Sequence, residues 1–305
     1  MNAKPGMGPD FVKQRGPGER PAHDPGSVPT SPVTVAHLQD MKREGRKIVG
    51  VVAWDYQIAR IADRAGVDLV SVGDSVGINL WGRVDPLDMT LEEMIVVCKA
   101  VRRGTARALV SCDFPFGPLQ RGTESALAAA RRLVKEGGAD MVKLDDAAEF
   151  PQAVRAIADA GIPVFAQMGI TQGNAAKYGI GHAQMLGGAI QVPREMAERL
   201  VEEARLLEKA GASLIDFTSS GPVAGPRVVQ AVSIPVLGGL GGGPWLDGRM
   251  RMAHAAIGYA ASALDSKAET YANVARVTLD ALSAYADDVR SARQIKGGIP
   301  VKPGG

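Results

Sequence analysis

The chain has 305 residues, of which 46% are hydrophobic and 22% charged, and its formal net charge at pH 7 is +2. This length allows one large core, and the near balance of charge argues against nucleic acid or a membrane surface as a partner. The two cysteines, Cys98 and Cys112, form neither a disulfide framework nor a zinc-ligand spacing, which predicts a cytoplasmic protein. No segment approaches the roughly 18 consecutive apolar residues of a membrane helix.

Residues 1–32 are rich in Pro and Gly and carry few large apolar side chains. Such a segment buries too little surface to offset the entropy that it would lose on ordering. We therefore expect residues 1–32 to form a flexible tail and residues 33–305 to form a single domain. The alternative is a tail that docks on a neighbouring subunit.

A repeated pattern of helix, glycine and short apolar strand begins at Thr34, which is placed to cap a first helix. Strands are expected near residues 47–53, 68–73, 107–112, 140–144, 163–167, 213–217 and 234–238, with a weaker eighth after Gly248. Strands that alternate with helices of this length indicate βαβ units and a parallel sheet. The number of units favours a closed (β/α)8 TIM barrel, with extra helices at both ends of the chain, over an open sheet.

Two segments depart from this pattern. Residues 169–192 are long, Gly-rich and polar, which is typical of an extended loop over a barrel rim. Residues 267–293 carry Ala, Val and Leu at helical spacing and predict one long C-terminal helix. We expect this helix to pack on the barrel or on another subunit.

Polar residues follow several of the apolar strands directly, at the ends where a barrel of this kind builds its active site. They are Asp55, Asp74, Ser75, Asp113, Lys143, Asp145, Gln167, Asp216 and Thr218. Several carboxylates on one rim repel one another unless a cation lies between them, and oxygen ligands favour Mg2+ over Zn2+. The alternative for Asp74 and Asp113 is that they cap the helices that follow. His182 and His254 have no metal-ligand spacing, and we interpret both as structural or peripheral.

Several of these segments carry a resemblance to a known family. They are Val72-Gly-Asp-Ser-Val-Gly77, Ala100-Val-Arg-Arg-Gly104, Cys112-Asp-Phe-Pro-Phe116, Gly138-Ala-Asp-Met-Val-Lys143, Ile162-Pro-Val-Phe-Ala-Gln-Met-Gly-Ile-Thr171, Ile234-Pro-Val-Leu-Gly238 and Asp247-Gly248. In this order and at this spacing, over residues 34–260, the chain resembles the ketopantoate hydroxymethyltransferases. The phosphoenolpyruvate mutase and isocitrate lyase relatives of the same magnesium-dependent barrel superfamily share only the general layout.

The resemblance implies a homo-oligomer, a decamer in that family, in which Mg2+ holds the 2-oxo acid 3-methyl-2-oxobutanoate. It also implies 5,10-methylenetetrahydrofolate as the co-substrate that supplies a hydroxymethyl group. Matched residue by residue, Asp74 and Asp113 are metal ligands, and Asp145 stands where the family has a glutamate near the metal. Ser75 then binds the substrate carboxylate, and Lys143 lies beside the site as a catalytic and substrate-binding residue.

The chain departs from the family where protons are transferred. Gln167 replaces the histidine of the family's Gly-His-Leu-Gly motif, and Thr218 aligns with the catalytic glutamate of the sixth strand. Asp216 lies two residues before Thr218 on the same strand face, so it is the candidate base, with Gln167 and Thr218 as substrate-binding residues. Two alternatives remain open: a diverged aldolase or lyase that acts on another 2-oxo acid, and a non-catalytic 2-oxo acid-binding paralogue.

Overall fold

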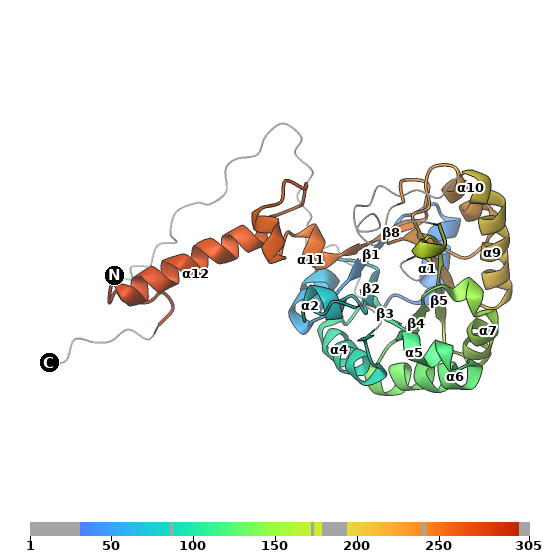
Figure 1. Cartoon of the computed structure of the whole chain (residues 1–305), viewed down its shortest axis with the longest axis horizontal. Helices are drawn as coiled ribbons and strands as arrows, with labels where there is room; N and C mark the ends of the chain where they lie inside the picture. Colours follow the sequence, from blue (N-terminus) through green and yellow to red (C-terminus); the bar gives the residue numbers. More distant parts are fainter. Residues whose placement is uncertain (1–30, 86–87, 172–173, 179–193, 240–241, 299–305) are drawn as a thin grey trace, which may run out of the picture.

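The computed structural model describes residues 31–85, 88–171, 174–178, 194–239 and 242–298, and a closed parallel barrel lies at its centre (Figure 1). Its strands are β1 (Ile48–Val52), β2 (Leu69–Val72), β3 (Leu109–Asp113), β4 (Met141–Leu144), β5 (Val164–Gly169), β6 (Leu214–Thr218), β7 (Val236–Gly238) and β8 (Gly248–Met252). Each strand pairs with its neighbours in sequence, and β1 pairs with β8 to close the ring. The predicted (β/α)8 barrel is confirmed.

Helices surround the barrel in the order expected of βαβ units. They are α1 (Val35–Arg43), α2 (Tyr56–Arg64), α3 (Val76–Asn79), α4 (Leu91–Gly104), α5 (Phe116–Gln120), α6 (Thr123–Arg132), α7 (Pro151–Asp159), α9 (Ala197–Lys209), α10 (Ala224–Ala231) and α11 (Ala253–Ala256). At the joints after α2 and α9, Gly66 and Gly211 have φ of 81° and 100°, which only glycine adopts at little energetic cost. No helix of the described residues is long and apolar enough to cross a membrane.

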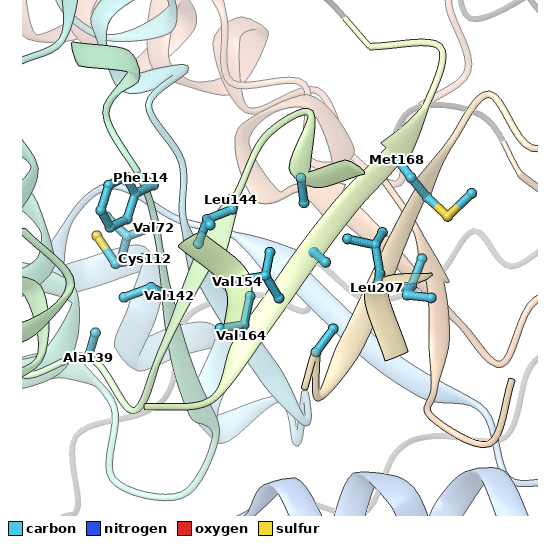
Figure 2. Close-up of a cluster of buried hydrophobic side chains, with 14 of the residues drawn as sticks. Val72, Cys112, Phe114, Ala139, Val142, Leu144, Val154, Val164, Met168 and Leu207 are labelled. Carbon is cyan, nitrogen blue, oxygen red and sulfur yellow. The ribbon is translucent and has the colours of Figure 1, made fainter. Parts of the chain in front are cut away.

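Two apolar layers separate the inside of the barrel from its outside. Outward side chains such as Val142 and Val164 pack against Val154 of α7 in a layer between the strands and the helices (Figure 2). Inward side chains such as Leu109, Met141 and Phe165 fill the barrel interior. Along a strand every second side chain points inward. The polar residues that follow these inward apolar side chains therefore lie at the carboxyl end of the barrel.

The C-terminal helix is α12 (Val274–Arg290), which Figure 1 shows projecting away from the barrel. It is shorter than the predicted 267–293, because the side chain of Asn273 caps it by accepting a hydrogen bond from the Arg276 backbone N–H at 2.9 Å. Ala292, with φ of 50°, follows its last turn. Apart from Ala275, no residue of this helix is buried.

Three predictions concern residues at or beyond the limits of the described structure. Residues 1–30 of the predicted tail and most of the predicted loop 169–192 lie outside the described residues. Within that loop, β5 extends to Gly169, and a 3-10 turn, η5, covers Ala175–Tyr178. The domain boundary at residue 33 stays a prediction; Val33 itself is packed, and its backbone N–H donates to the Arg107 carbonyl at 2.8 Å.

Hydrogen bonds join Arg83, in the segment after β2, to the first turn of α4. Glu93 completes a capping box with Thr90, because it accepts from the Thr90 backbone N–H at 3.0 Å while its own N–H donates to Thr90 Oγ1. Arg83 also donates to Glu93, with Nη1 at 3.2 Å from Oε2. Hydrogen bonds from Arg83 and then from the Thr90 backbone lower the pKa of Glu93 from 4.5 to about 2.

We predict that Glu93→Gln lowers the free energy of unfolding by about 1 kcal/mol at pH 7. The pKa of Glu93 is lower in the folded than in the unfolded chain, so its stabilisation is complete above pH 4.5 and is lost as the pH falls towards 2. Urea unfolding at several pH values should therefore show a difference between variant and wild type that shrinks below pH 4.5. Glu124→Gln, at the exposed start of α6, is the matched control, and an equal effect there would contradict the prediction.

Candidate active site

The predicted polar residues converge at the carboxyl end of the barrel. The register places Asp113 of β3 opposite Lys143 of β4, and Gln167 of β5 opposite Asp216 of β6. Asp74 and Ser75 follow β2 after Gly73, and Asp145 follows β4 directly. Neither Asp74 nor Asp113 caps a helix, because α3 begins after Ser75 and α5 after Pro115. Asp55 is different, since its Oδ1 accepts from the Gln57 N–H at 2.8 Å and caps α2.

Lys143 is the centre of this arrangement. Its buried ammonium Nζ lies 2.8 Å from Asp145 Oδ1, 3.4 Å from Asp113 Oδ2 and 3.8 Å from Asp216 Oδ2. Burial alone would lower the pKa of Lys143, but the three carboxylates outweigh it and hold the pKa well above its ordinary value. The three carboxylates therefore favour the charged ammonium form of Lys143.

The carboxylates crowd one another despite this lysine. Burial raises the pKa of Asp113 to about 6 against the opposing effect of Lys143, and the charges of Asp145 and Asp216 add to the rise. Burial also raises the pKa of Asp74 well above its ordinary value, and the nearby charges of Asp145 and Asp113 raise it further. Two serines extend the network below, because Ser71 Oγ lies 2.7 Å from Ser111 Oγ and 3.4 Å from Asp113 Oδ1.

The donor set matches a hard divalent cation in its chemistry. Asp74, Asp113 and Asp145 present carboxylate oxygens whose mutual repulsion a cation relieves. In the described part of the chain, however, no three His, Cys, Asp or Glu side chains are gathered closely enough to hold a metal ion as they stand. These residues therefore fit the ion by their chemistry, although their side chains are not arranged as a metal site in this structure.

Asp216 is anchored on several sides. Its Oδ1 accepts from the Gly239 backbone N–H at 3.0 Å. The Gln167 amide either donates to Asp216 Oδ2 at 3.3 Å or, turned over, donates to Asp145 Oδ1 at 3.2 Å and accepts from Lys143 at 3.3 Å. Burial raises the pKa of Asp216, and Lys143, Gly239 and Gln167 oppose that rise. The structure thus brings Asp216 and Gln167 into one network with Lys143.

Three polar atoms at this end of the barrel are buried without a hydrogen-bond partner among the described residues. They are the hydroxyl Oγ1 of Thr218, at the end of β6, the indole Nε1 of Trp54, two residues after β1, and the imidazole Nδ1 of His254. Trp54 stacks on His254, with ring centroids 4.6 Å apart. Burial lowers the pKa of His254 although Asp55 lies 3.5 Å away, so this histidine is neutral at pH 7.

Sequence reasoning missed Trp54, Ser71 and Ser111. The serines could have been found, because Ser71 and Ser111 lie two residues from the inward Leu69 and Leu109 and so point to the same side. The position of Trp54 depends on its contact with His254, about 200 residues away in the chain, which no local pattern reveals. His254 is buried and packed between two aromatic rings, which agrees with the structural interpretation.

Comparison with known proteins decides the family. A sequence model of the ketopantoate hydroxymethyltransferases matches residues 32–294. The chain belongs to this family. A 3-methyl-2-oxobutanoate hydroxymethyltransferase of Cyanothece sp. is 37% identical over 262 residues, which are 85% of this chain and 97% of the relative. The enzyme of the same name from Thermoanaerobacter sp. is 33% identical over 259 residues, 85% of this chain and 92% of the relative.

Solved structures of more distant proteins share the fold. A 2,3-dimethylmalate lyase, a member of the PEP mutase/isocitrate lyase superfamily, superimposes with a TM-score of 0.56 at 16% identity, covering 88% of this chain and 99% of the lyase. A phosphonopyruvate hydrolase, solved with oxalate and Mg2+, gives a TM-score of 0.52 at 14% identity, covering 88% and 92%. The hydroxymethyltransferase family is a family of transferase enzymes. The chain shares its barrel fold with the lyase and the hydrolase named above.

We predict that Lys143→Met destabilises this ketopantoate hydroxymethyltransferase family member by roughly 3 kcal/mol at pH 8, because it leaves buried carboxylates without their cation. Without Lys143, the folded-state pKa values of Asp113 and Asp216 rise further above their ordinary values. A raised carboxyl pKa costs stability as the pH rises, so the loss should be smaller at pH 5 than at pH 8.

Urea unfolding in EDTA at the two pH values measures this effect. Lys135→Met, at an exposed position beyond α6, is the matched control and should change the free energy of unfolding by less than about 0.5 kcal/mol. A Lys143→Met protein as stable as the wild type at pH 8 would contradict the central role of this lysine.

Proposed function

We propose that this chain forms a carbon–carbon bond at C3 of a 2-oxo acid, by transfer of a hydroxymethyl group to 3-methyl-2-oxobutanoate from 5,10-methylenetetrahydrofolate. The observation that carries the proposal is the buried Lys143 ammonium among Asp113, Asp145 and Asp216 at the carboxyl end of the barrel. A site of this kind binds a small anion, offers ligands for a cation and holds a carboxylate that can accept a proton. The family's hydroxymethyltransferase chemistry needs all three.

The metal half of the site consists of Asp74, Asp113 and Asp145. In this proposal they hold Mg2+, which when bound to a 2-oxo acid draws electrons from its carbonyl group and so makes the proton at C3 more acidic. Burial first, and then the charges of the neighbouring carboxylates, raise the pKa values of Asp74 and Asp113, and a bound cation would offset both by favouring the ionised carboxylates.

The substrate half of the site supplies hydrogen-bond donors. Ser75 is half-buried at the start of α3, and its side chain makes no capping hydrogen bond, so its hydroxyl is available to the substrate carboxylate. The Lys143 ammonium provides a positive charge for an anionic substrate. Gln167 and Thr218 offer an amide and an unpaired hydroxyl from β5 and β6. Together these groups orient the oxo acid with its C3 towards β6.

Asp216 is the proposed base that accepts the C3 proton. Its pKa is raised by burial, which improves a carboxylate as a proton acceptor near neutral pH. The Gly239 backbone N–H holds one oxygen at 3.0 Å and leaves the other near Gln167 and Lys143, which lies 3.8 Å away. The proton gained by Asp216 is therefore taken up beside the Lys143 ammonium.

A second candidate is cleavage of a carbon–carbon bond in a different 2-oxo acid. Thr218 favours it, because its buried hydroxyl stands where the family resemblance places a catalytic glutamate, and a hydroxyl is neutral near pH 7. Complementation of a pantothenate auxotroph separates the candidates, since only the hydroxymethyl transfer restores growth. Metal-dependent binding of a 2-oxo acid without any turnover would instead indicate a non-catalytic paralogue.

We also propose a homo-oligomer, a decamer by family resemblance, in which α12 contributes to a contact between copies. Val277, Leu282, Tyr285 and Val289 of this helix are each more than half exposed. An isolated helix with such a surface gains stability by covering it with another apolar surface. Light scattering of the purified protein measures the assembly directly.

The metal assignment predicts the effect of Asp113→Asn. This change removes one negative charge and keeps the shape of the side chain, so we expect Mg2+ to bind at least tenfold more weakly, the equivalent of about 1.4 kcal/mol or more. Isothermal titration with Mg2+ measures the affinity. Asp63→Asn, at the opposite end of the barrel, where Asp63 accepts from the Arg107 backbone N–H, is the matched control. Unchanged affinity in Asp113→Asn would reject Asp113 as a ligand.

The base assignment predicts that Asp216→Asn abolishes exchange of the C3 proton of 3-methyl-2-oxobutanoate with deuterium oxide. Mg2+ binding should survive, because Asp216 is not among the proposed ligands. Proton NMR of the oxo acid follows the exchange, and it should slow by roughly a hundredfold or more. Normal exchange in this variant would place the base elsewhere and leave Asp216 as an anchor for Lys143 and Gly239.

A second variant tests the position of the base by adding a carboxylate instead of removing one. Thr218→Glu introduces a carboxylate where the family resemblance expects one. We expect it to raise hydroxymethyl transfer relative to the wild type and to restore proton exchange in an Asp216→Asn background. Thr218→Gln, which has the same length without the charge, is the control and should do neither.

A further inference from the structure

Two buried serines lie one step below the rim of the barrel, and the proposed mechanism does not use them. Ser71 of β2 and Ser111 of β3 are both buried, and the register pairs them across the neighbouring strands. They lie two residues beyond the inward-pointing Leu69 and Leu109, so they form the first polar step above the apolar interior. A buried hydroxyl is unfavourable unless it is hydrogen-bonded, so the partners of this pair show what it does.

The contacts of the two hydroxyls fix the direction of their protons. Ser71 Oγ lies 2.7 Å from Ser111 Oγ and 3.4 Å from Asp113 Oδ1. An ionised Asp113 has only acceptors, so the Ser71 hydroxyl must donate to it. Each serine carries one hydroxyl proton, so Ser111 must in turn donate to Ser71. With Asp113 ionised, this is the only order of donors in which both contacts are hydrogen bonds.

These donors hold one side of the Asp113 carboxylate. At 3.4 Å the contact from Ser71 is long for an O–H···O hydrogen bond. The 2.7 Å bond from Ser111 strengthens it, because a hydroxyl that accepts a hydrogen bond becomes a better donor. On the other side of the carboxylate, Lys143 Nζ lies 3.4 Å from Asp113 Oδ2. Donors from β2 and β4 therefore face both oxygens and restrict rotation of the group.

We propose that Ser71, backed by Ser111, is a positioning residue that holds the Asp113 carboxylate in one orientation and so strengthens its binding of the cation. This inference rests on the proposed function, which makes Asp113 a ligand of Mg2+. A carboxylate that is already held loses less conformational freedom when an ion binds to it. An oxygen that accepts one hydrogen bond keeps a further lone pair for an ion. Removing such a partner of a metal ligand weakens metal binding by roughly tenfold to a hundredfold.

The first experiment measures Mg2+ binding to the full-length protein by titration calorimetry at pH 8. Ser71→Ala should bind Mg2+ about tenfold or more weakly than the wild type. Ser220→Ala is the matched control, because Ser220 is buried just after β6, but its Oγ accepts from the Trp245 indole at 3.0 Å. It should bind Mg2+ as the wild type does. Equal affinity of Ser71→Ala and the wild type would overturn the inference.

A second pair of variants separates the hydroxyl from the packing and keeps the test valid if Ser71→Ala fails to fold. Ser71→Thr and Ser71→Val have side chains of the same shape, both suited to a strand, and only threonine keeps the hydroxyl. Ser71→Thr should bind Mg2+ about tenfold or more tightly than Ser71→Val. Equal affinities would mean that residue 71 acts through packing alone, which would overturn the inference. A wild-type protein that binds no Mg2+ would reject the proposed function, and this inference with it.

Discussion

The site depends on one buried ion cluster, in which the Lys143 ammonium lies within 4 Å of carboxylates from three positions on the rim. Three acids against one base leave an excess of negative charge in a place where water screens little. Burial raises the pKa of Asp113 and Asp74, and the excess charge raises it further, so a cation at the rim would be favourable. The same contacts join β3, β4 and β6 at their carboxyl ends, so the groups that could perform chemistry also hold the mouth of the barrel in shape.

Much of the fold could be predicted because each barrel unit repeats the same local chemistry. A glycine ends the helix, a short apolar run follows, and a polar residue ends the strand, so the first seven strands were placed within two residues of their observed limits, while the eighth was expected only after Gly248. The start of α12 was placed too early, because the capping of Asn273 overrides a helical pattern that begins before it. The convergence of Asp113, Lys143 and Asp216 followed from topology alone. Their distances did not, since these depend on side-chain rotamers and on neighbours such as Gly239.

Asp216 and Thr218 show why the loss of a carboxylate at one position is not simply made good by a carboxylate two residues away. The two residues lie on the same face of β6, but Asp216 lies one step deeper, where Gly239 and Lys143 already engage its carboxylate. A group that serves as an anchor can accept a proton only if its contacts survive the loss of its charge. The backbone N–H of Gly239 binds a carboxyl group less strongly once that group is neutral. The raised pKa of Asp216 reduces this penalty, because the neutral form is already favoured by burial.

The unpaired polar atoms at the barrel mouth connect stability to binding. Trp54 Nε1 follows β1 and Thr218 Oγ1 ends β6, and these strands are separated in the ring by β7 and β8. Each buried donor without a partner lowers the stability of the free protein by roughly 1–3 kcal/mol. This end of the barrel is therefore less stable in the free protein than a fully paired rim would be, which is typical of a binding site.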